Sequence, residues 1–131
     1  MVEIANAAFF PAGTITIGTD SYKSAILSAT LTPTTPTEVL RDIGGGITTV
    51  AGTPEWALGL NLAQDLKTAN SLSQYLIANA GTKKTIVYTP QTGGKGFTVT
   101  ALILPAAVGG AGGAAAKSDV TLPCDGQPTI A

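Results

Sequence analysis

The chain has 131 residues, a length typical of a single domain, and its formal net charge is −1. This near-neutral balance gives no electrostatic reason to expect nucleic acid or an anionic membrane as a partner. Only 11% of the residues are charged, against about 25% in an average globular domain, and the mean hydropathy is positive at +0.32. Two explanations stand: other subunits cover part of the surface, or the protein is a stable, weakly charged monomer.

Residue types that carry most enzyme and metal chemistry are scarce. The chain has no histidine and one cysteine, Cys124, so an internal disulfide is impossible. Its carboxylates are scattered, and we therefore expect no catalytic residues, no metal site and no cofactor. Cys124 is interpreted as a small buried apolar residue. Glycine-rich stretches at 93–96 and 109–116 lack the long following helix of a nucleotide-binding turn, which favours flexible loops.

Alternation of side chains predicts strands in the N-terminal third. In TITIG, Ile15 and Ile17 share one face. The segment YKSAILSATL then separates two sets of side chains. The apolar set is Ala25, Leu27, Ala29 and Leu31, and the opposite set, mostly small hydroxyls, is Ser24, Ile26, Ser28 and Thr30. We expect the hydroxyl face to meet water.

A projecting hairpin or loop is predicted over 32–53. Pro33 and Pro36 cannot lie inside a central strand, and three glycines at 44–46 favour a tight tip. EVLRDI reads as an edge strand and ITTVA as its partner. The charged residues Glu38, Arg41 and Asp42 either contact a neighbouring subunit or only solvate the loop.

The most regular strand pattern leads into the only predicted helix. Trp56, Leu58, Leu60 and Leu62 alternate with smaller residues, which predicts a core strand. A helix follows over about 71–80, with Ser71 and Gln74 at capping-box spacing. A helix this short is unstable alone, so Leu72, Leu76 and Ile77 are expected to dock it on a sheet.

The remaining segments predict further strands. TIVYTP and GFTVTALIL flank the turn sequence QTGGK, and Val120 and Leu122 alternate in a last strand. The uncharged stretch from Gly96 to Ala116 is not expected to cross a membrane, because Pro105 and several glycines interrupt it.

Two sequence motifs carry a resemblance to a known family. The helix SLSQYL followed by NAGTK, and the ending VTLPCDGQPT, resemble the major tail tube proteins of long, flexible-tailed phages and of related gene-transfer particles. The likeness extends over about 53–130, whereas the N-terminal half is similar in pattern only.

The resemblance implies one domain over 1–131, a β-sandwich or rolled β-barrel with one flanking helix. It also implies an N-terminal arm (1–12), a projecting loop (32–53) and a C-terminal arm (117–131). In that family, six copies form a ring and stacked rings form a tube, which holds the tape-measure protein and conducts DNA without binding a specific sequence. Tail-terminator and distal-tail proteins are further implied partners. The expected location is the virion tail, assembled in the bacterial cytoplasm, with no membrane partner.

Small, polar or acidic side chains would suit the wall of such a channel, because a basic wall would hold DNA by its phosphates. We expect Ser24, Ser28, Thr30 and Asp20 to contribute to it. One alternative is a monomeric β-sandwich binding module, which would need an exposed aromatic platform. A small hydrolase is a third possibility, and the lack of histidine argues against it.

Overall fold

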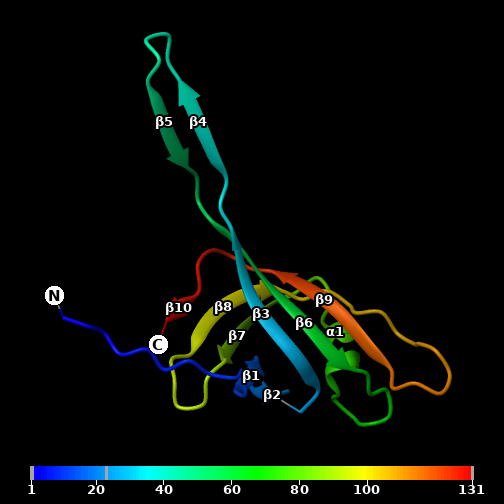
Figure 1. The fold of residues 1–131 in the computed structure, drawn as a ribbon. Coiled ribbons are helices and arrows are strands. Elements are labelled where there is room, and N and C mark those ends of the chain that lie inside the picture. Colours follow the sequence, from blue (N-terminus) through cyan, green and yellow to red (C-terminus); the bar gives the residue numbers. More distant parts are fainter. Residues whose placement is uncertain (1, 23, 131) are drawn as a thin grey trace.

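The computed structural model describes residues 2–22 and 24–130 and is mainly β, with 46% of residues in strands and 5% in one helix. Two sheets lie face to face and are not closed, as in a β-sandwich (Figure 1). The prediction of a mainly β fold with one short flanking helix is confirmed. In chain order the elements are β1 (Thr14–Ile17), β2 (Asp20–Ser21), β3 (Ile26–Thr34), β4 (Thr37–Arg41), β5 (Ile47–Ala51), β6 (Glu55–Ala63), α1 (Leu72–Ala78), β7 (Lys83–Thr89), β8 (Phe97–Leu102), β9 (Lys117–Pro123) and β10 (Thr129–Ile130).

All strand pairings between these elements are antiparallel. One sheet has the order β10-β8-β7-β1-β2, the second has the order β3-β6-β9, and β4 pairs only with β5. Figure 1 shows the β4–β5 hairpin rising well clear of the two packed sheets. The molecule therefore has a body and one long projection.

The core lies between the two sheets and follows the period-two pattern of the sequence. Leu58, Leu60 and Leu62 of β6 are buried, as are Val120 and Leu122 of β9. From the facing sheet come Ile15, Ile17, Ile86, Val99 and Ala101. Each buried branched side chain contributes roughly 1.5–3 kcal/mol to stability. These alternating positions therefore supply most of the hydrophobic stabilisation of the body.

A bulge in β3 changes one part of the predicted alternation. The register with β6 shifts between Ile26 and Ser28, so Ile26 packs against the core and Leu27 is 55% exposed. The sequence pattern placed Leu27 inside and Ile26 outside. An extra residue in one strand reverses the facing of the residues before it, and strict alternation cannot show this.

Helix α1 closes one end of the sandwich. Leu72 and Leu76 are fully buried in the same core cluster as the sheet residues, whereas Ile77 is 49% exposed. Ile77, expected to dock beside the two leucines, therefore lies on the outward side. The helix follows the C-terminal end of β6 and leads into β7, so it covers the end of the core rather than an outer sheet face.

The expected capping box does not form. Ser71 is the N-cap residue, but its side chain makes no capping hydrogen bond. Its hydroxyl instead donates to the carbonyl oxygen of Asp65, and Gln74 Nε2 donates to the carbonyl oxygen of Leu66 at 2.9 Å. Both side chains fasten the loop between β6 and the helix.

The two terminal segments differ. Residues 2–11 are exposed, and the N-terminal part of this segment extends away from the body (Figure 1); residue 1 lies outside the described residues. The C-terminal arm expected over 117–131 needs correction, because β9 is a core strand and β10 pairs with β8. Within the described part of the chain, no helix has the length and hydropathy to cross a membrane.

Candidate functional site

The two strands of the β4–β5 hairpin do not pack against the body. All ten residues of its two strands are exposed. The ladder breaks where it leaves the body, at Pro36 and Pro54, since proline has no backbone N–H to donate. Only the Gly52 N–H reaches across this break, to the carbonyl oxygen of Pro36 at 2.8 Å. An isolated two-stranded hairpin is marginally stable in water.

The tip of the hairpin is well defined. Asp42 accepts a hydrogen bond from the Gly46 N–H at 2.8 Å through its side chain, and its own N–H donates to the Gly46 carbonyl oxygen at 3.0 Å. A Cβ atom on Gly46 would lie 2.4 Å from an Asp42 carboxylate oxygen, and Gly45 has a φ of +89°. Asp42 therefore shapes the turn, which leaves Glu38 and Arg41 as the charged side chains on its strands.

Both faces of the hairpin carry apolar side chains. The register pairs Glu38 with Val50 and Leu40 with Thr48 on one face. The other face contains Val39 and Ile47, and all four of these apolar residues are exposed. A hairpin that packed on one surface would need only one apolar face, so this one has the composition of an element held between two surfaces.

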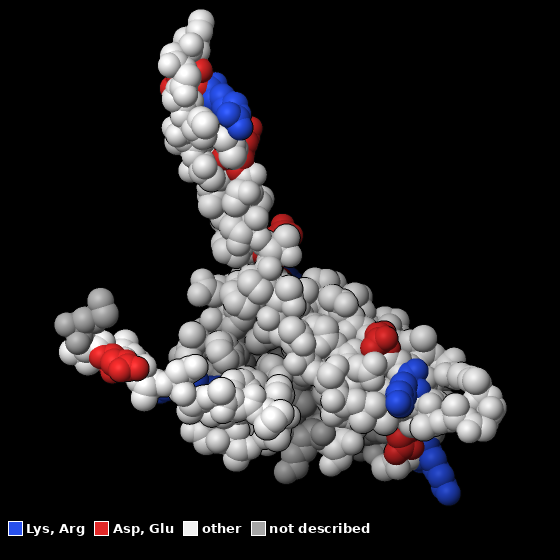
Figure 2. Space-filling model, viewed as in Figure 1, with Lys and Arg blue, Asp and Glu red and all other residues white. Residues whose placement is uncertain are grey.

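The outer face of the β3-β6-β9 sheet is made of small and polar residues. Ser28, Thr30 and Thr32 lie opposite Asn61, Gly59 and Ala57 on this face. On the neighbouring strand β9, Asp119 pairs with Asn61, whose Nδ2 donates to the Asp119 carboxylate at 2.6 Å. Figure 2 shows a molecule whose visible surface is largely uncharged, with charged residues on the hairpin, on and beside the N-terminal segment, and toward the opposite end of the body.

The predicted channel residues do not all share this face. Ser28 and Thr30 lie on it together. Ser24 lies in the turn before β3, and Asp20 lies in β2 of the other sheet. The structure therefore brings two of the four residues together, and it adds Thr32, Asn61 and Thr121, which the sequence analysis did not single out.

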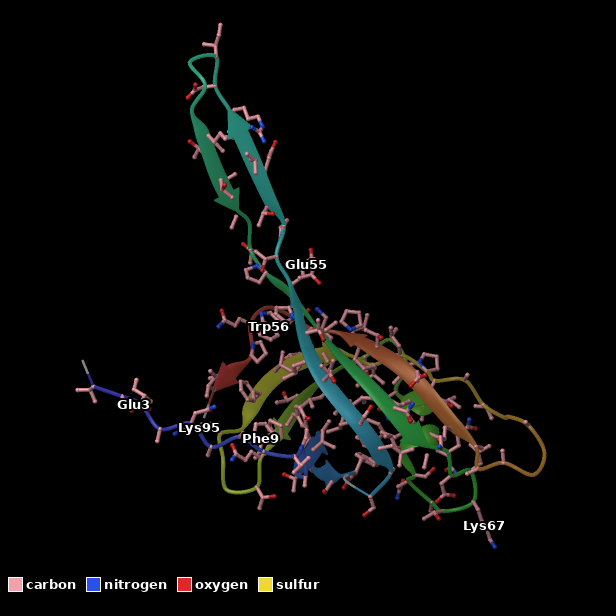
Figure 3. The ribbon with its side chains drawn as sticks, viewed as in Figure 1. Glu3, Phe9, Glu55, Trp56, Lys67 and Lys95 are labelled. Carbon is pink, nitrogen blue, oxygen red and sulfur yellow. The ribbon has the colours of Figure 1, made fainter. Side chains whose placement is uncertain are left out.

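An apolar groove opens at the end of the sandwich opposite the helix. It has a volume of about 400 Å³, and its lining includes Phe9, Leu31, Trp56, Tyr88, Pro90 and Phe97. Leu31 lies within β3, Trp56 near the start of β6, Tyr88 near the end of β7 and Phe97 at the start of β8. Phe9 comes from the N-terminal segment; Figure 3 labels it together with Trp56. Leu31 and Tyr88 also pack against the core, whereas Phe9 is 48% exposed.

Trp56 adds an unpaired polar group beside this groove. Its indole Nε1 is buried and has no acceptor among the described residues. An unpaired buried donor costs about 1–3 kcal/mol. Sequence reasoning predicted a buried Trp56 but missed the groove, because the groove depends on which strand ends lie together.

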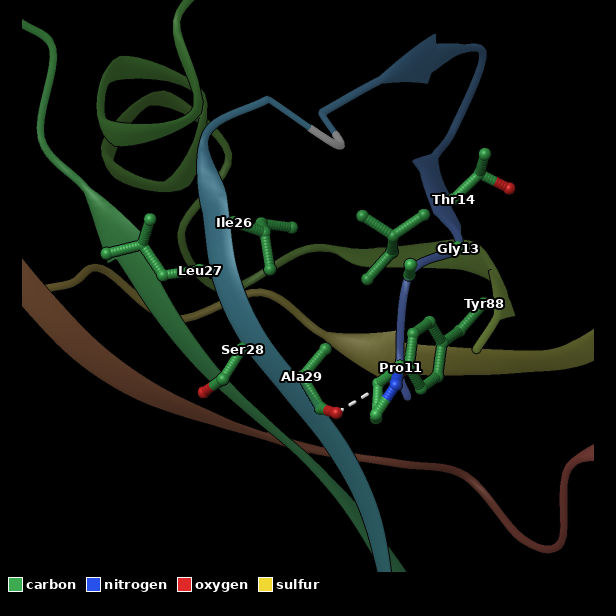
Figure 4. A pocket seen from close by; sticks show the side chains of 10 residues that line it. Pro11, Gly13, Thr14, Ile26, Leu27, Ser28, Ala29 and Tyr88 are labelled. Atoms are coloured by element: carbon green, nitrogen blue, oxygen red, sulfur yellow. Dashed lines mark hydrogen bonds between the residues drawn. The ribbon is translucent and has the colours of Figure 1, made fainter. Parts of the chain in front are cut away.

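A second hollow of about 190 Å³ lies between the start of β1 and the outer edge of β3. Figure 4 shows Tyr88 spanning it, with the phenolic hydroxyl donating to the Ala29 carbonyl oxygen at 2.8 Å. Gly13 lies at its rim, where a Cβ atom would fall 1.5 Å from the Thr89 carbonyl oxygen. The residues lining this hollow carry no charged side chain.

Among the described residues, the ionisable groups include one ion pair, between the exposed side chains of Lys83 and Asp125 at 3.0 Å. Hydrogen bonds from the Thr68 side chain and from the backbone N–H groups of Thr68 and Lys67 lower the pKa of Asp65. Burial raises the pKa of the Cys124 thiol and that of Tyr88. Within residues 2–22 and 24–130, no three His, Cys, Asp or Glu side chains lie close enough to hold a metal ion.

Comparison with known proteins does not assign the chain to a family. No protein-family model matches the chain, and a search of curated proteins found no relative.

Proposed function

We propose that the protein is a structural subunit that assembles with copies of itself into stacked rings, forming a tube of the phage-tail type. The observation that carries the proposal is the β4–β5 hairpin, whose strand residues are all exposed and which is apolar on both faces. Such an element is a liability in a lone molecule. Burial against neighbouring copies gives it a stable environment.

Unpaired sheet edges support contacts within a ring. In the β3-β6-β9 sheet, β3 and β9 are the outer strands, with nine and seven residues. Among the described residues, the free edge of β9 is bridged only at its end, between Cys124 and Ala101. Pairing β9 of one copy with β3 of the next is a heterologous contact, and it closes into a ring if the rotation between copies allows.

The outer face of that sheet suits the wall of a conduit. A ring formed by β3 and β9 would present Ser28, Thr30, Asn61, Asp119 and Thr121 on one side of a continuous sheet. These side chains are small or polar. Lys117, at the start of β9, is the one basic residue on this part of the face, so passing DNA would meet few cations.

The likeness of SLSQYL and VTLPCDGQPT to tail tube proteins suggests which assembly the subunits form. It is the source for rings of six, for the tape-measure protein and DNA as contents, and for tail-terminator and distal-tail proteins as partners at the tube ends. The virion tail is the corresponding location.

A hairpin-shortened variant tests the proposal. Replacing residues 37–51 by a two-residue Asn-Gly turn joins β3 to β6 without altering the body. Light scattering after size exclusion should show large assemblies for the wild type and monomers or single rings for the variant. Deleting residues 111–113 from the exposed glycine-rich loop is the matched control and should leave assembly unchanged. A wild type that remains monomeric at every concentration would rule the proposal out.

The groove favours a second candidate, a monomeric binding module. Its lining brings Trp56, Tyr88 and Phe97 together, which supplies part of the aromatic platform that such a module needs. In this case the hairpin-shortened variant and the wild type would both be monomers, and an oligosaccharide or peptide would change the emission of Trp56 in both.

A further inference from the structure

We infer that the groove at the open end of the sandwich receives the N-terminal segment of a second copy, with Ile4 in the groove and Glu3 paired with Lys95. This inference rests on the proposed self-assembly and specifies one of its contacts. It begins from an asymmetry in the body: helix α1 closes one end of the core through Leu72 and Leu76, whereas Phe9 and Pro11 of the N-terminal segment line the groove at the other end but leave it open.

The N-terminal segment has the properties that such a plug needs. Val2 and Ile4 are each 87% exposed and Phe10 is 95% exposed. The segment is held to the body at Ala12, whose N–H donates to the Pro90 carbonyl oxygen at 3.2 Å and whose carbonyl oxygen accepts from the Thr92 hydroxyl. Before that anchor, residues 2–11 form no strand or helix. This is an apolar segment without a surface to cover it.

The length and direction of the N-terminal segment favour the groove of a second copy over the groove of its own chain. Ala12 lies eight positions after Ile4, and a fully extended chain of that length spans up to about 28 Å. Figure 1 shows the segment leading away from the body, although Phe9 and Pro11 lie at the groove of their own chain. To fill that same groove, Ile4 would have to fold back past Phe9, whereas a neighbouring groove can be entered from outside.

Charge complementarity fixes the orientation. No charged side chain lines the groove. Lys95 lies in the loop before β8, two residues before the lining residue Phe97, and Glu3 is the one charged residue of the segment (Figure 3). The ion pair found within the described residues joins Lys83 to Asp125 and involves neither of them. With Ile4 inside the groove, Glu3 at the rim can reach Lys95.

Trp56 provides a direct readout, because it is the only tryptophan in the chain and it lines the groove. In the wild type, rising protein concentration should shift Trp56 emission to the blue and reduce its quenching by acrylamide. Ile4→Asp would place a carboxylate in the apolar groove and should weaken association at least tenfold. Ala5→Asp adds the same charge on the opposite side of an extended segment and should weaken it less than threefold.

A charge exchange separates contact between copies from contact within one chain. Glu3→Lys and Lys95→Glu should each weaken association about three- to tenfold, since each sets like charges against each other. The double variant should recover, and so should an equimolar mixture of the two single variants. Recovery in the double variant without recovery in the mixture would show that the segment fills its own groove, and would overturn the inference.

The outcomes also separate this inference from the proposed function. If the wild type does not associate, both fail. If it associates and Ile4→Asp associates equally well, with the same Trp56 emission, only the inference fails, and the tube assembly stands on the hairpin and the sheet edges.

Discussion

A hydrogen bond between Tyr88 and Ala29 joins the two sheets. The Tyr88 hydroxyl on β7 donates to the Ala29 carbonyl oxygen on β3 at 2.8 Å, across 59 residues of sequence (Figure 4). Because β3 is also the outer strand of its sheet, this bond holds an edge that the proposed ring needs in a fixed position.

We expect Tyr88→Phe to lower the free energy of unfolding by about 0.5–1.5 kcal/mol, the usual net contribution of one hydrogen bond. Urea denaturation measures this change. Tyr75→Phe is the matched control, because the Tyr75 hydroxyl donates to no acceptor within the described residues, and its effect should be smaller. Equal losses in the two variants would show that the bond to Ala29 contributes nothing.

Gly13 is expected to tolerate no side chain. A Cβ atom there would lie 1.5 Å from the Thr89 carbonyl oxygen, so Gly13→Ala must push the N-terminal segment off β7. Overpacking of this kind costs about 1–3 kcal/mol. Gly112→Ala, with nothing within 4 Å of the added atom, should change the free energy of unfolding by less than about 0.5 kcal/mol. Both changes can be read from thermal or urea unfolding.

The helix offers a comparison between neighbouring residues. Leu76 is fully buried and Ile77 is half exposed. Leu76→Ala should therefore destabilise the fold by about 2–5 kcal/mol, through lost burial and the cavity it leaves. Ile77→Ala should cost less than about 1 kcal/mol. A loss for Ile77 as large as that for Leu76 would mean that Ile77 docks the helix beside the leucines, as the sequence predicted.

Acid should weaken the loop between β6 and the helix. Asp65 accepts from the N–H groups of Lys67 and Thr68 at 2.9 and 3.0 Å, and these bonds, with the Thr68 side chain, lower its pKa. The folded pKa lies below the unfolded value near 3.8. The carboxylate thus stabilises the fold above that value, and this contribution is lost as the pH falls through the folded pKa.

Unfolding measured between about pH 6 and about pH 2 tests this linkage. The wild type should lose more stability across that range than Asp65→Asn, which keeps an acceptor oxygen but has no proton to bind. Identical pH profiles would contradict the role of Asp65.

The core strands were predictable from sequence because each depends on local alternation. Leu58, Leu60 and Leu62 of β6 are one example, and Val120 and Leu122 of β9 are another. Ile26 and Leu27 were assigned to the wrong faces because a bulge leaves no mark in the pattern. Ile77 was placed in the core because its helical position lies next to the buried stripe, and only the packed structure shows where that stripe ends.

The contact surfaces were less predictable than the strands. The groove combines Leu31, Trp56, Tyr88 and Phe97 from four strands whose order in space comes from the sheet pairing and not from the chain. The hydroxyls at Ser28 and Thr30 were recognised by alternation. Ser24 precedes the bulge, and Asp20 belongs to the other sheet. Local pattern identifies a face within one strand, and the topology decides which faces adjoin.

Electron microscopy of the purified protein over a range of concentrations would show the assembly itself. We expect hollow tubes of stacked rings, with β9 of each copy beside β3 of the next and each hairpin buried between copies. Separate single molecules at every concentration, with the hairpin free in solvent, would contradict it.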